Sequence, residues 1–265
     1  MPKDIPFTVI ENRLAAEGIY VIRLRSNEAI TIPSAGQFAM VKIGSGAHPL
    51  LRRPFSYAGI TNSEIHFIYK VVGKGTRILS RVKKEEQLKV LGPLGKGFDL
   101  SLAKKKALLV GGGMGFAPLL YLASALTKKN NLAVELIVGT KSASFLPSDF
   151  ISNRVAPSVQ VSFATEDGSI GYRGMVSDLL VDIFSKRQNY DVIYSCGPMP
   201  MLKVISQIAQ THRLPCEVSV EALMACGVGA CMGCVVPGGE GEYLRACTDG
   251  PVFKAEELFG KECNA

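Results

Sequence analysis

The chain has 265 residues and a formal net charge of +7; 47% of the residues are hydrophobic and 20% are charged. This composition is that of a globular protein able to bury a sizeable core, and it excludes an intrinsically disordered chain. The basic residues are scattered in short groups such as Lys104-Lys105-Lys106, so we expect solvated surface and anion sites rather than a nucleic-acid interface. The first residues lack the apolar stretch of a secretory signal, and we expect a cytoplasmic protein.

Residues 1–100 contain short apolar strands separated by turns, a pattern typical of all-β folds. A single helix is expected over Thr76–Val82, directly after Gly73 and Gly75. Strands with one short helix in this order predict a small antiparallel β-barrel. The expected strands are Phe7–Arg13, Ile19–Ser26, Gln37–Ile43, Pro54–Gly59, Glu64–Val72 and Gln87–Leu91.

Two short motifs in the barrel segment suit a ligand with phosphates and a planar ring. In Arg53-Pro54-Phe55-Ser56, the guanidinium can bind a phosphate, the aromatic ring can pack on a planar group and the hydroxyl can bond a ring heteroatom. In Gly73-Lys74-Gly75-Thr76, the N–H groups and the threonine hydroxyl suit a pyrophosphate. An arginine before a strand is most often a surface residue, so the prediction depends on finding both motifs in one small barrel.

Residues 101–215 have a different period, in which apolar strands alternate with helices, and this predicts a parallel sheet wrapped by helices. Residues 107–127 carry no charge and are long enough to span a bilayer. Their glycines and Pro118 predict instead a strand, a turn and a helix, and no membrane span. The expected strands are Ala107–Val110, Ala133–Val138, Val159–Ala164 and Asp191–Ser195, and the expected helices lie at 119–126, Met175–Phe184 and Met201–Gln210.

Two strand ends in this segment are candidate ligand sites. The first strand runs into Gly111-Gly112-Gly113-Met114-Gly115, and a glycine turn there exposes N–H groups to a pyrophosphate at the helix N-terminus. The pattern is not a complete G-x-G-x-x-G, so a plain glycine turn stays an alternative. A later strand ends in Cys196-Gly197-Pro198, at the sheet edge where such folds bind ligands. A small buried thiol is the alternative interpretation of Cys196.

Residues 216–265 carry the most specific motif, four cysteines with the spacing C-x4-C-x2-C-x12-C. They are Cys226, Cys231, Cys234 and Cys247. Their order is the plant-type ligand spacing for a [2Fe–2S] cluster. Glycines between them let a loop bend tightly, with its N–H groups turned toward the sulfurs. A zinc site, a pair of disulfides and unrelated buried thiols stay open as alternatives.

A barrel with R-P-x-S and G-x-G-T, followed by an α/β segment with G-G-G-x-G and C-G-P, resembles the ferredoxin–NADP reductase superfamily. With the segments 221–231 and 245–253 added, the chain resembles, along its full length, the family of electron-transfer subunits of class 1B dihydroorotate dehydrogenases. The resemblance implies a multidomain fold: an antiparallel FAD-binding β-barrel over 1–100, a parallel-sheet NAD-binding α/β domain over 101–215 and a C-terminal [2Fe–2S] segment over 216–265.

The resemblance also implies which residues contact the cofactors. No acidic residue clearly marks an adenosine ribose, so NAD rather than NADP rests on the resemblance, and Phe55 keeps the ring but not the hydroxyl of the tyrosine frequent in the superfamily. The cluster ligands are the four cysteines, the implied FAD residues are Arg53, Pro54, Phe55, Ser56, Ile68, Tyr69, Lys70, Gly75 and Thr76, and the implied NAD(H) residues are Gly111, Gly112, Gly113 and Gly115, with Cys196 as the catalytic contact near the nicotinamide.

In such a family, a partner subunit containing FMN oxidises dihydroorotate in pyrimidine (UMP) biosynthesis. The chain is then expected to be an NAD-dependent oxidoreductase subunit that takes single electrons through its cluster to FAD and passes them to NAD as hydride. The family implies a heterotetramer with two copies of each subunit. Met224 and Met232 are candidates for an apolar docking surface near the cluster, although core filling is the commoner use of methionine.

Two other functions stay open on the sequence. The first is a homologous flavin and iron–sulfur reductase subunit of a hydrogenase or of a ferredoxin-linked complex. The second belongs to another class, a zinc-stapled binding module that senses nucleotides.

Overall fold

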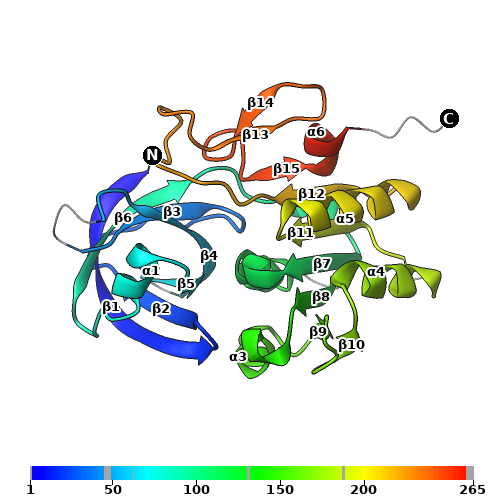
Figure 1. The fold of residues 1–265 in the computed structure, drawn as a ribbon, viewed down its shortest axis with the longest axis horizontal. Coiled ribbons are helices and arrows are strands. Elements are labelled where there is room, and N and C mark those ends of the chain that lie inside the picture. The colour runs from blue at the N-terminus through cyan, green and yellow to red at the C-terminus, as the bar shows by residue number, and fades with distance from the viewer. Residues whose placement is uncertain (1, 45–48, 62, 130–131, 187–188, 261–265) are drawn as a thin grey trace.

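The computed structural model describes residues 2–44, 49–61, 63–129, 132–186 and 189–260. In this part of the chain a β-barrel, blue and cyan in Figure 1, lies beside a larger α/β unit in green and yellow. The C-terminal residues, orange and red, lie along the top of both in this view. The arrangement confirms the predicted fold class, an antiparallel barrel with a parallel-sheet unit and a C-terminal segment.

The barrel closes completely within the described residues, in the strand order β1-β2-β5-β4-β3-β6. Strand β1 pairs with both β2 and β6, so the barrel has no free edge. Alternate side chains such as Ile5, Phe7 and Val9 are buried, as the two-residue period of a strand requires. The elements are β1 (Lys3–Ala16), β2 (Ile19–Arg25), β3 (Phe38–Lys42), β4 (Arg53–Thr61), β5 (Glu64–Lys70), α1 (Lys74–Leu79) and β6 (Gln87–Leu94).

The α/β unit is built on one sheet with the order β10-β9-β8-β7-β11-β12-β15. Neighbouring strands are parallel except for β12 and β15. Strands β7 and β8 are mostly apolar along their length, because helices cover both faces of such a sheet. The strands are β7 (Lys106–Gly112), β8 (Ala133–Thr140), β9 (Val159–Thr165), β10 (Tyr172–Arg173), β11 (Val192–Cys196), β12 (Cys216–Ser219) and β15 (Val252–Lys254), and the helices are α2 (Phe116–Leu126), α3 (Ser148–Arg154), α4 (Val176–Ser185), α5 (Met199–Thr211) and α6 (Ala255–Phe259).

Two strands of the C-terminal segment complete this sheet. Strand β12 lies parallel to β11, and β15 returns antiparallel to β12. Between them the chain leaves the sheet and forms a hairpin of β13 (Val235–Pro237) and β14 (Tyr243–Arg245). The part of the chain that carries the four cysteines is therefore an excursion held at both ends by one strand pair.

Most expected elements are present, with ends that differ by a few residues. The uncharged run at residues 107–127 forms β7, a 3-10 turn (Gly113–Gly115) and α2, as predicted. Among the residues that the structure describes, no helix is both long and apolar enough to cross a membrane. The sequence does not predict α3 or α6. It also does not predict the short strands β12 and β15, which join the C-terminal segment to the sheet.

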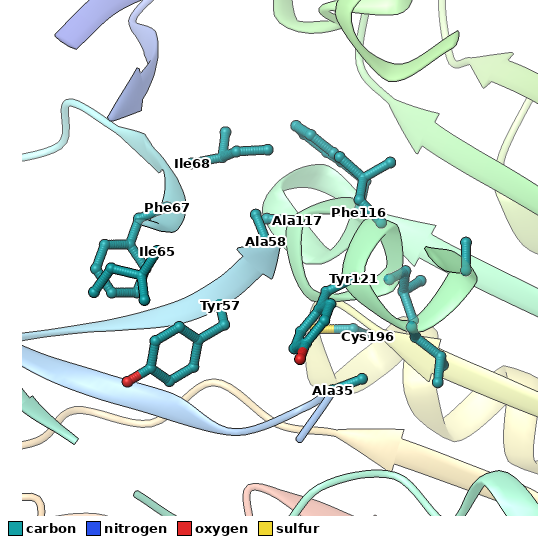
Figure 2. Close-up of a cluster of buried hydrophobic side chains, with 14 of the residues drawn as sticks. Ala35, Tyr57, Ala58, Ile65, Phe67, Ile68, Phe116, Ala117, Tyr121 and Cys196 are labelled. Carbon is teal, nitrogen blue, oxygen red and sulfur yellow. The ribbon is translucent and has the colours of Figure 1, made fainter. Parts of the chain in front are cut away.

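The barrel and the α/β unit share one apolar core. Helix α2 lies between the sheet and the barrel, and Figure 2 shows Ala117 and Tyr121 of this helix beside Ala58 of β4. The Tyr121 hydroxyl donates to the buried carbonyl oxygen of Pro33, in the connection between β2 and β3, at 2.6 Å. The two units therefore bury apolar surface against each other.

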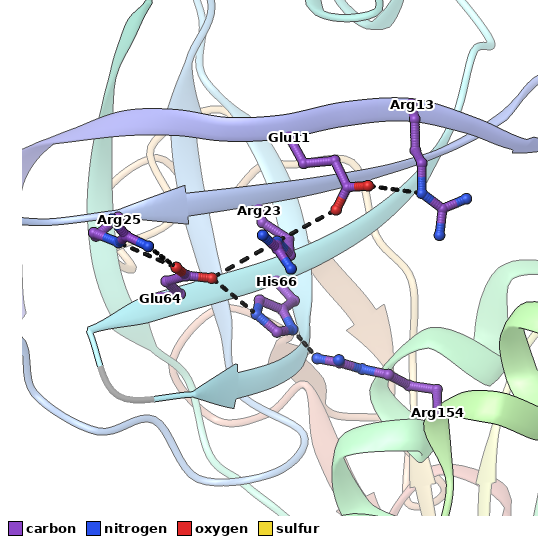
Figure 3. Close-up of polar contacts among 7 residues, drawn as sticks. All are labelled: Glu11, Arg13, Arg23, Arg25, Glu64, His66 and Arg154. Atoms are coloured by element: carbon purple, nitrogen blue, oxygen red, sulfur yellow. Dashed lines mark hydrogen bonds and ion pairs between the residues drawn. The ribbon is translucent and has the colours of Figure 1, made fainter. Parts of the chain in front are cut away.

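A polar network forms a second contact between the two units (Figure 3). The Arg154 guanidinium, at the end of α3, contacts Nδ1 of the buried His66 in β5. His66 Nε2 lies 3.9 Å from the carboxylate of Glu64, which also pairs with Arg25. The contact joins the barrel to α3, so the relative position of the two units does not depend on α2 alone.

The Tyr121→Phe substitution tests the contact at Pro33. Losing the hydroxyl leaves a buried carbonyl oxygen without its donor, and we expect the free energy of unfolding to fall by about 1–2 kcal/mol. Urea denaturation followed by circular dichroism measures this loss. The matched control is Tyr172→Phe, at an exposed tyrosine of β10, which should change stability little; equal losses in the two variants would contradict the assignment.

Candidate functional site

A cleft of about 380 Å³ opens between the barrel, the start of α2 and the segment that follows β12. It brings together predicted residues from three distant parts of the chain. Those that line it are Arg53, Pro54, Phe55, Ser56, Ile68, Tyr69, Lys70, Thr76 and Cys196. Sequence reasoning did not find the other lining residues, which are Phe38, Val72, Met114, Ala117, Pro118, Pro251 and residues 219–224.

The barrel wall of the cleft is aromatic and firmly held. The Phe55 ring lies 5.7 Å from the Tyr69 ring, centroid to centroid. Tyr69 in turn stacks on Tyr20 and donates its hydroxyl to Asn12 Oδ1 at 2.9 Å. Burial raises the pKa of Tyr69 well above its usual value, so this hydroxyl keeps its proton. A wall of this kind suits the packing of a planar ring.

The guanidinium of Arg53 lies at one end of this wall. A Cβ atom on Gly75 would lie 2.8 Å from Arg53 Nε, so glycine is what lets the guanidinium lie against the start of α1. Gly75 lies behind Arg53 and does not itself line the cleft. The Thr76 hydroxyl accepts N–H bonds from Val72 and Gly73 at 3.0 and 3.2 Å, so it holds the turn at the start of α1. The arginine is therefore the best-placed group here for a phosphate.

The cleft also reaches across to the α/β unit. The Lys70 ammonium, at the end of β5, lies 4.4 Å from the ring centroid of Phe145. Phe145 belongs to the 3-10 turn Ala143–Phe145 that follows β8. This cation–π contact places Lys70 at the border between the two units. A ligand that contacts both units would lie beside it.

Three of the four predicted glycines are packed against the protein itself. A Cβ atom on Gly111 would lie 3.0 Å from the Phe116 nitrogen, and one on Gly112 would lie 2.3 Å from Met201 Sδ of α5. A Cβ atom on Gly115 would lie 1.9 Å from the Cys196 carbonyl oxygen. These glycines let the turn pack closely on the end of β11 and the start of α5.

Gly113 differs from the other glycines of the turn. Its φ of +55° is a left-handed conformation that favours glycine, and a Cβ atom there would meet nothing within 4 Å. Gly113 therefore presents backbone to open space. If the turn binds a phosphate, the geometry favours contact at Gly113, while its neighbours hold the turn in place.

Cys196 lies at the carboxyl end of β11 with two polar groups that sequence reasoning missed. Burial, and after it the nearby Glu221 carboxylate, raises the pKa of the Cys196 thiol to about 12, against a weaker lowering by the Ser219 hydroxyl. Glu221 lines the cleft, yet burial by the surrounding protein raises the pKa of its carboxyl. The site therefore holds a neutral thiol, a hydroxyl and a carboxyl that retains its proton more readily than usual.

The four predicted cysteines lie together in the excursion between β12 and β15, as two contacting pairs. The side chains of Cys226 and Cys231 are in contact, and so are those of Cys234 and Cys247. Cys234 and Cys247 are buried, Cys226 is half-buried and Cys231 is exposed. The six cysteines within the described residues are free, so none of these four forms a disulfide.

Backbone N–H groups of the loop point at the sulfurs, as the glycine-rich spacing predicts. Val228 donates to Cys226 Sγ at 3.4 Å, Gly229 to Cys247 Sγ at 3.2 Å and Gly233 to Cys231 Sγ at 3.4 Å. The Val228 N–H is the main cause that lowers the pKa of the Cys226 thiol to about 6. Donors of this kind stabilise thiolate ligands.

The paired arrangement bears on which metal the cysteines fit. A zinc site needs four ligands around one ion, whereas a [2Fe–2S] cluster needs two thiolates on each of two irons. Two pairs of cysteines with N–H donors to the sulfurs therefore fit the cluster better than zinc.

The cysteines and the cleft are neighbours in space. Phe38 lines the cleft and packs in the same apolar cluster as Cys234 and Cys247. A Cβ atom on Gly227 would lie 2.6 Å from Met40 Cγ, so the cysteine loop rests directly on β3 of the barrel. Met224 lines the cleft and precedes Cys226 by two residues, a distance of at most about 7 Å along the chain.

The comparisons with known proteins agree with this geometry. Residues 221–259 match the family model of the iron–sulfur cluster binding domain of dihydroorotate dehydrogenase B. The chain is 41% identical over 258 residues to the electron transfer subunit of dihydroorotate dehydrogenase B (NAD(+)) from Bacillus caldolyticus, covering 95% of this chain and 96% of that protein. It is 36% identical over 257 residues to the subunit of the same name from Fusobacterium nucleatum, covering 95% and 96%.

Solved structures resemble the whole architecture. A chain from an NADH-dependent reduced ferredoxin-NADP oxidoreductase matches with a TM-score of 0.81 and 27% identity, covering 98% of this chain and 93% of that chain. The ferredoxin reductase of carbazole 1,9a-dioxygenase matches with a TM-score of 0.69 and 19% identity, covering 81% and 67%, which shows the fold alone.

The Gly115→Ala substitution tests how the glycine turn is packed. Its Cβ atom would overlap the Cys196 carbonyl oxygen, so the turn or the end of β11 must move, and we expect a loss of about 1–3 kcal/mol in the free energy of unfolding. Thermal and urea denaturation measure the loss. The control is Gly73→Ala, where a Cβ atom meets nothing within 4 Å; a Gly115 variant as stable as this control would show that the turn is not packed as described.

Proposed function

This chain belongs to the family of dihydroorotate dehydrogenase B electron transfer subunits, and we propose that it carries electrons between a partner subunit and NAD through a [2Fe–2S] cluster and FAD. One observation carries the proposal: the cleft that collects most of the predicted flavin residues also contains Cys196, and its Phe38 packs in one apolar cluster with Cys234 and Cys247. This arrangement supports a nicotinamide site, a flavin site and a cluster site that follow one another along the cleft.

FAD is proposed to lie in the cleft against the barrel. The rings of Phe55 and Tyr69 would pack against its flavin ring. The guanidinium of Arg53 would bind its phosphates. Ser56, Ile68 and Lys70 line the same cleft at the border of the barrel. Pro54 fixes the backbone at the start of β4, and the Thr76 hydroxyl keeps the turn before α1 in shape.

NAD is proposed to bind at the carboxyl edge of the sheet, with Gly113 near its phosphates and Cys196 near its nicotinamide. A flavin exchanges one or two electrons, a nicotinamide a hydride and a [2Fe–2S] cluster a single electron, which sets their order along the path. The protein's part is positional. The buried Cys196 thiol keeps its proton because burial raises its pKa to about 12, and burial also raises the pKa of the Glu221 carboxyl at the cleft.

The partner is proposed to be an FMN-containing subunit that oxidises dihydroorotate in pyrimidine biosynthesis, in a cytoplasmic assembly of two copies of each chain. The names of the relatives support a partner, because each is a subunit of dihydroorotate dehydrogenase B. The same names favour this complex over a hydrogenase or a ferredoxin-linked reductase. The domain limits proposed for the chain are 1–100, 101–215 and 216–265, with β12 and β15 of the last range contributing to the sheet.

The surface around the cysteines suits such a partner. Leu223, Val228 and Met232, here called the cluster face, are 90%, 48% and 51% exposed although all are apolar. They flank the exposed Cys231 and the half-buried Cys226 in sequence. Apolar side chains this exposed beside a cluster site support docking of the partner there. Met232, predicted as a docking residue, belongs to this face, while Met224 lines the cleft instead.

Anaerobically purified protein should show flavin absorption with a broad iron–sulfur shoulder, and NADH should bleach both. In the Cys231→Ser variant we expect the cluster to be lost, because one of four thiolate ligands is removed, while FAD and its reduction by NADH remain. Iron and sulfide analysis and stopped-flow absorption measure the two effects separately.

Cys216→Ser is the matched control, since Cys216 lies at the start of β12 and outside the two pairs. It should retain the cluster. A colourless wild-type protein that contains zinc would contradict the proposed function, and loss of FAD from the Cys231 variant would contradict the separation of the two sites.

The Leu223→Ser substitution tests the cluster face. Leu223 is the most exposed residue of this face. If a partner buries its side chain, removing that side chain weakens association by about 1 kcal/mol or more, and we expect a dissociation constant raised at least several-fold. Analytical ultracentrifugation with the coexpressed FMN subunit measures it, with FAD content checked because Leu223 also lines the cleft. Val181→Ser, at an exposed apolar residue of α4, should leave association unchanged; an equal effect of both substitutions would contradict docking at this face.

A further inference from the structure

Arg245 closes a small loop around the fourth cysteine. Its backbone N–H and its Nε donate to Asp249 Oδ2 at 2.8 and 3.2 Å, and its Nη2 donates to Asp249 Oδ1 at 3.2 Å. Its carbonyl oxygen accepts N–H bonds from Thr248 and Asp249 at 3.2 and 2.8 Å. Cys247 lies in the middle of this closed loop and is buried. The loop therefore holds both the thiol and the guanidinium in fixed positions.

The guanidinium faces the cysteines. A Cβ atom on Gly229 would lie 3.6 Å from Arg245 Nη1, and the Gly229 N–H donates to Cys247 Sγ at 3.2 Å. Arg245 also stands in the strand pair next to Cys234, since it pairs with Val235 and the following Ala246 N–H donates to the Cys234 carbonyl oxygen at 3.0 Å. One positive charge is thus held close to the buried pair of cysteines.

The ion pair with Asp249 orients this charge without removing it. The carboxylate approaches the guanidinium through Nε and Nη2, which leaves Nη1 directed toward Gly229. The Arg245 and Asp249 side chains are 38% and 32% exposed, so solvent screens the charge only in part.

We propose that Arg245 is a positioning residue that raises the reduction potential of the cluster held by Cys226, Cys231, Cys234 and Cys247. The inference rests on the proposed function, because it requires the cluster. Reduction adds one negative charge to the cluster, and a fixed positive charge beside two of its ligands stabilises the reduced state more than the oxidised state. The neutral N–H donors of the loop act in the same direction but carry no net charge.

The test is a redox titration of the full chain, with the reduced cluster followed by electron paramagnetic resonance. Arg245→Gln should make the cluster harder to reduce, by a factor of up to about ten in the equilibrium constant, which is about 59 mV for a one-electron couple. Arg245→Lys keeps the charge and should stay near the wild-type midpoint. Lys128→Gln, an equal charge change at an exposed residue beyond α2, should leave the midpoint unchanged.

Asp249→Asn gives the opposite charge change in the same loop. With its one carbonyl oxygen in the place of Oδ2, the asparagine can still accept the bonds from the Arg245 backbone N–H and Nε, although not the one from Nη2. One negative charge is lost while most of the loop's bonds are kept, and the midpoint should rise. This variant also tests the proposal if Arg245→Gln fails to hold the cluster. Shifts of the same sign in the Gln and Asn variants, or equal shifts in the Gln and Lys variants, would overturn the electrostatic role.

The outcome separates the two proposals. If the wild-type chain binds no cluster, the proposed function fails before any potential is measured. If the wild type and the variants bind the cluster with one common midpoint, the proposed function stands and the role of Arg245 is overturned.

Discussion

The pairing of β12 with β15 is the constraint on which the candidate site depends. These two short strands continue the sheet of the α/β unit, and the whole cysteine-bearing excursion starts from one and ends at the other. Gly227 packs on Met40 of the barrel, so the excursion is also pressed against β3. A loop that is fixed at both ends and packed against β3 loses little further conformational entropy when it binds a cluster. The cysteines are consequently preorganised next to the cleft.

Local patterns in the sequence predict the two large units and the cysteine site. The change from strands at short intervals to alternating strands and helices near residue 100 marks the passage from barrel to parallel sheet, because each architecture imposes its own apolar period. The spacing of Cys226, Cys231 and Cys234 is likewise local, and the structure brings these residues and Cys247 together. Motifs that depend on neighbouring residues are visible before any fold is known.

The remaining parts of the site depend on contacts between distant segments, which no local pattern reports. Phe38 contributes to both the cleft and the cysteine cluster, yet as a residue of β3 it resembles any other apolar strand position. Ser219 and Glu221 reach Cys196 only because β12 lies beside β11. The glycines after β7 illustrate the same limit. Their sequence suggests a phosphate turn, whereas at Gly112 and Gly115 it is the approach of Met201 and Cys196 that requires the small residue.

The unequal burial of the four cysteines indicates how a cluster held by them would be oriented. Cys234 and Cys247 lie in the apolar core together with Phe38, whose other side borders the cleft, whereas Cys231 is exposed beside the cluster face. A cluster held by these residues would thus have one side toward the flavin site and the other toward solvent or a partner. Arg245 pairs with Val235 beside Cys234, and its side chain is 38% exposed, so solvent screens its charge in part. A fixed charge at this position would act on the side of the cluster that faces the cleft.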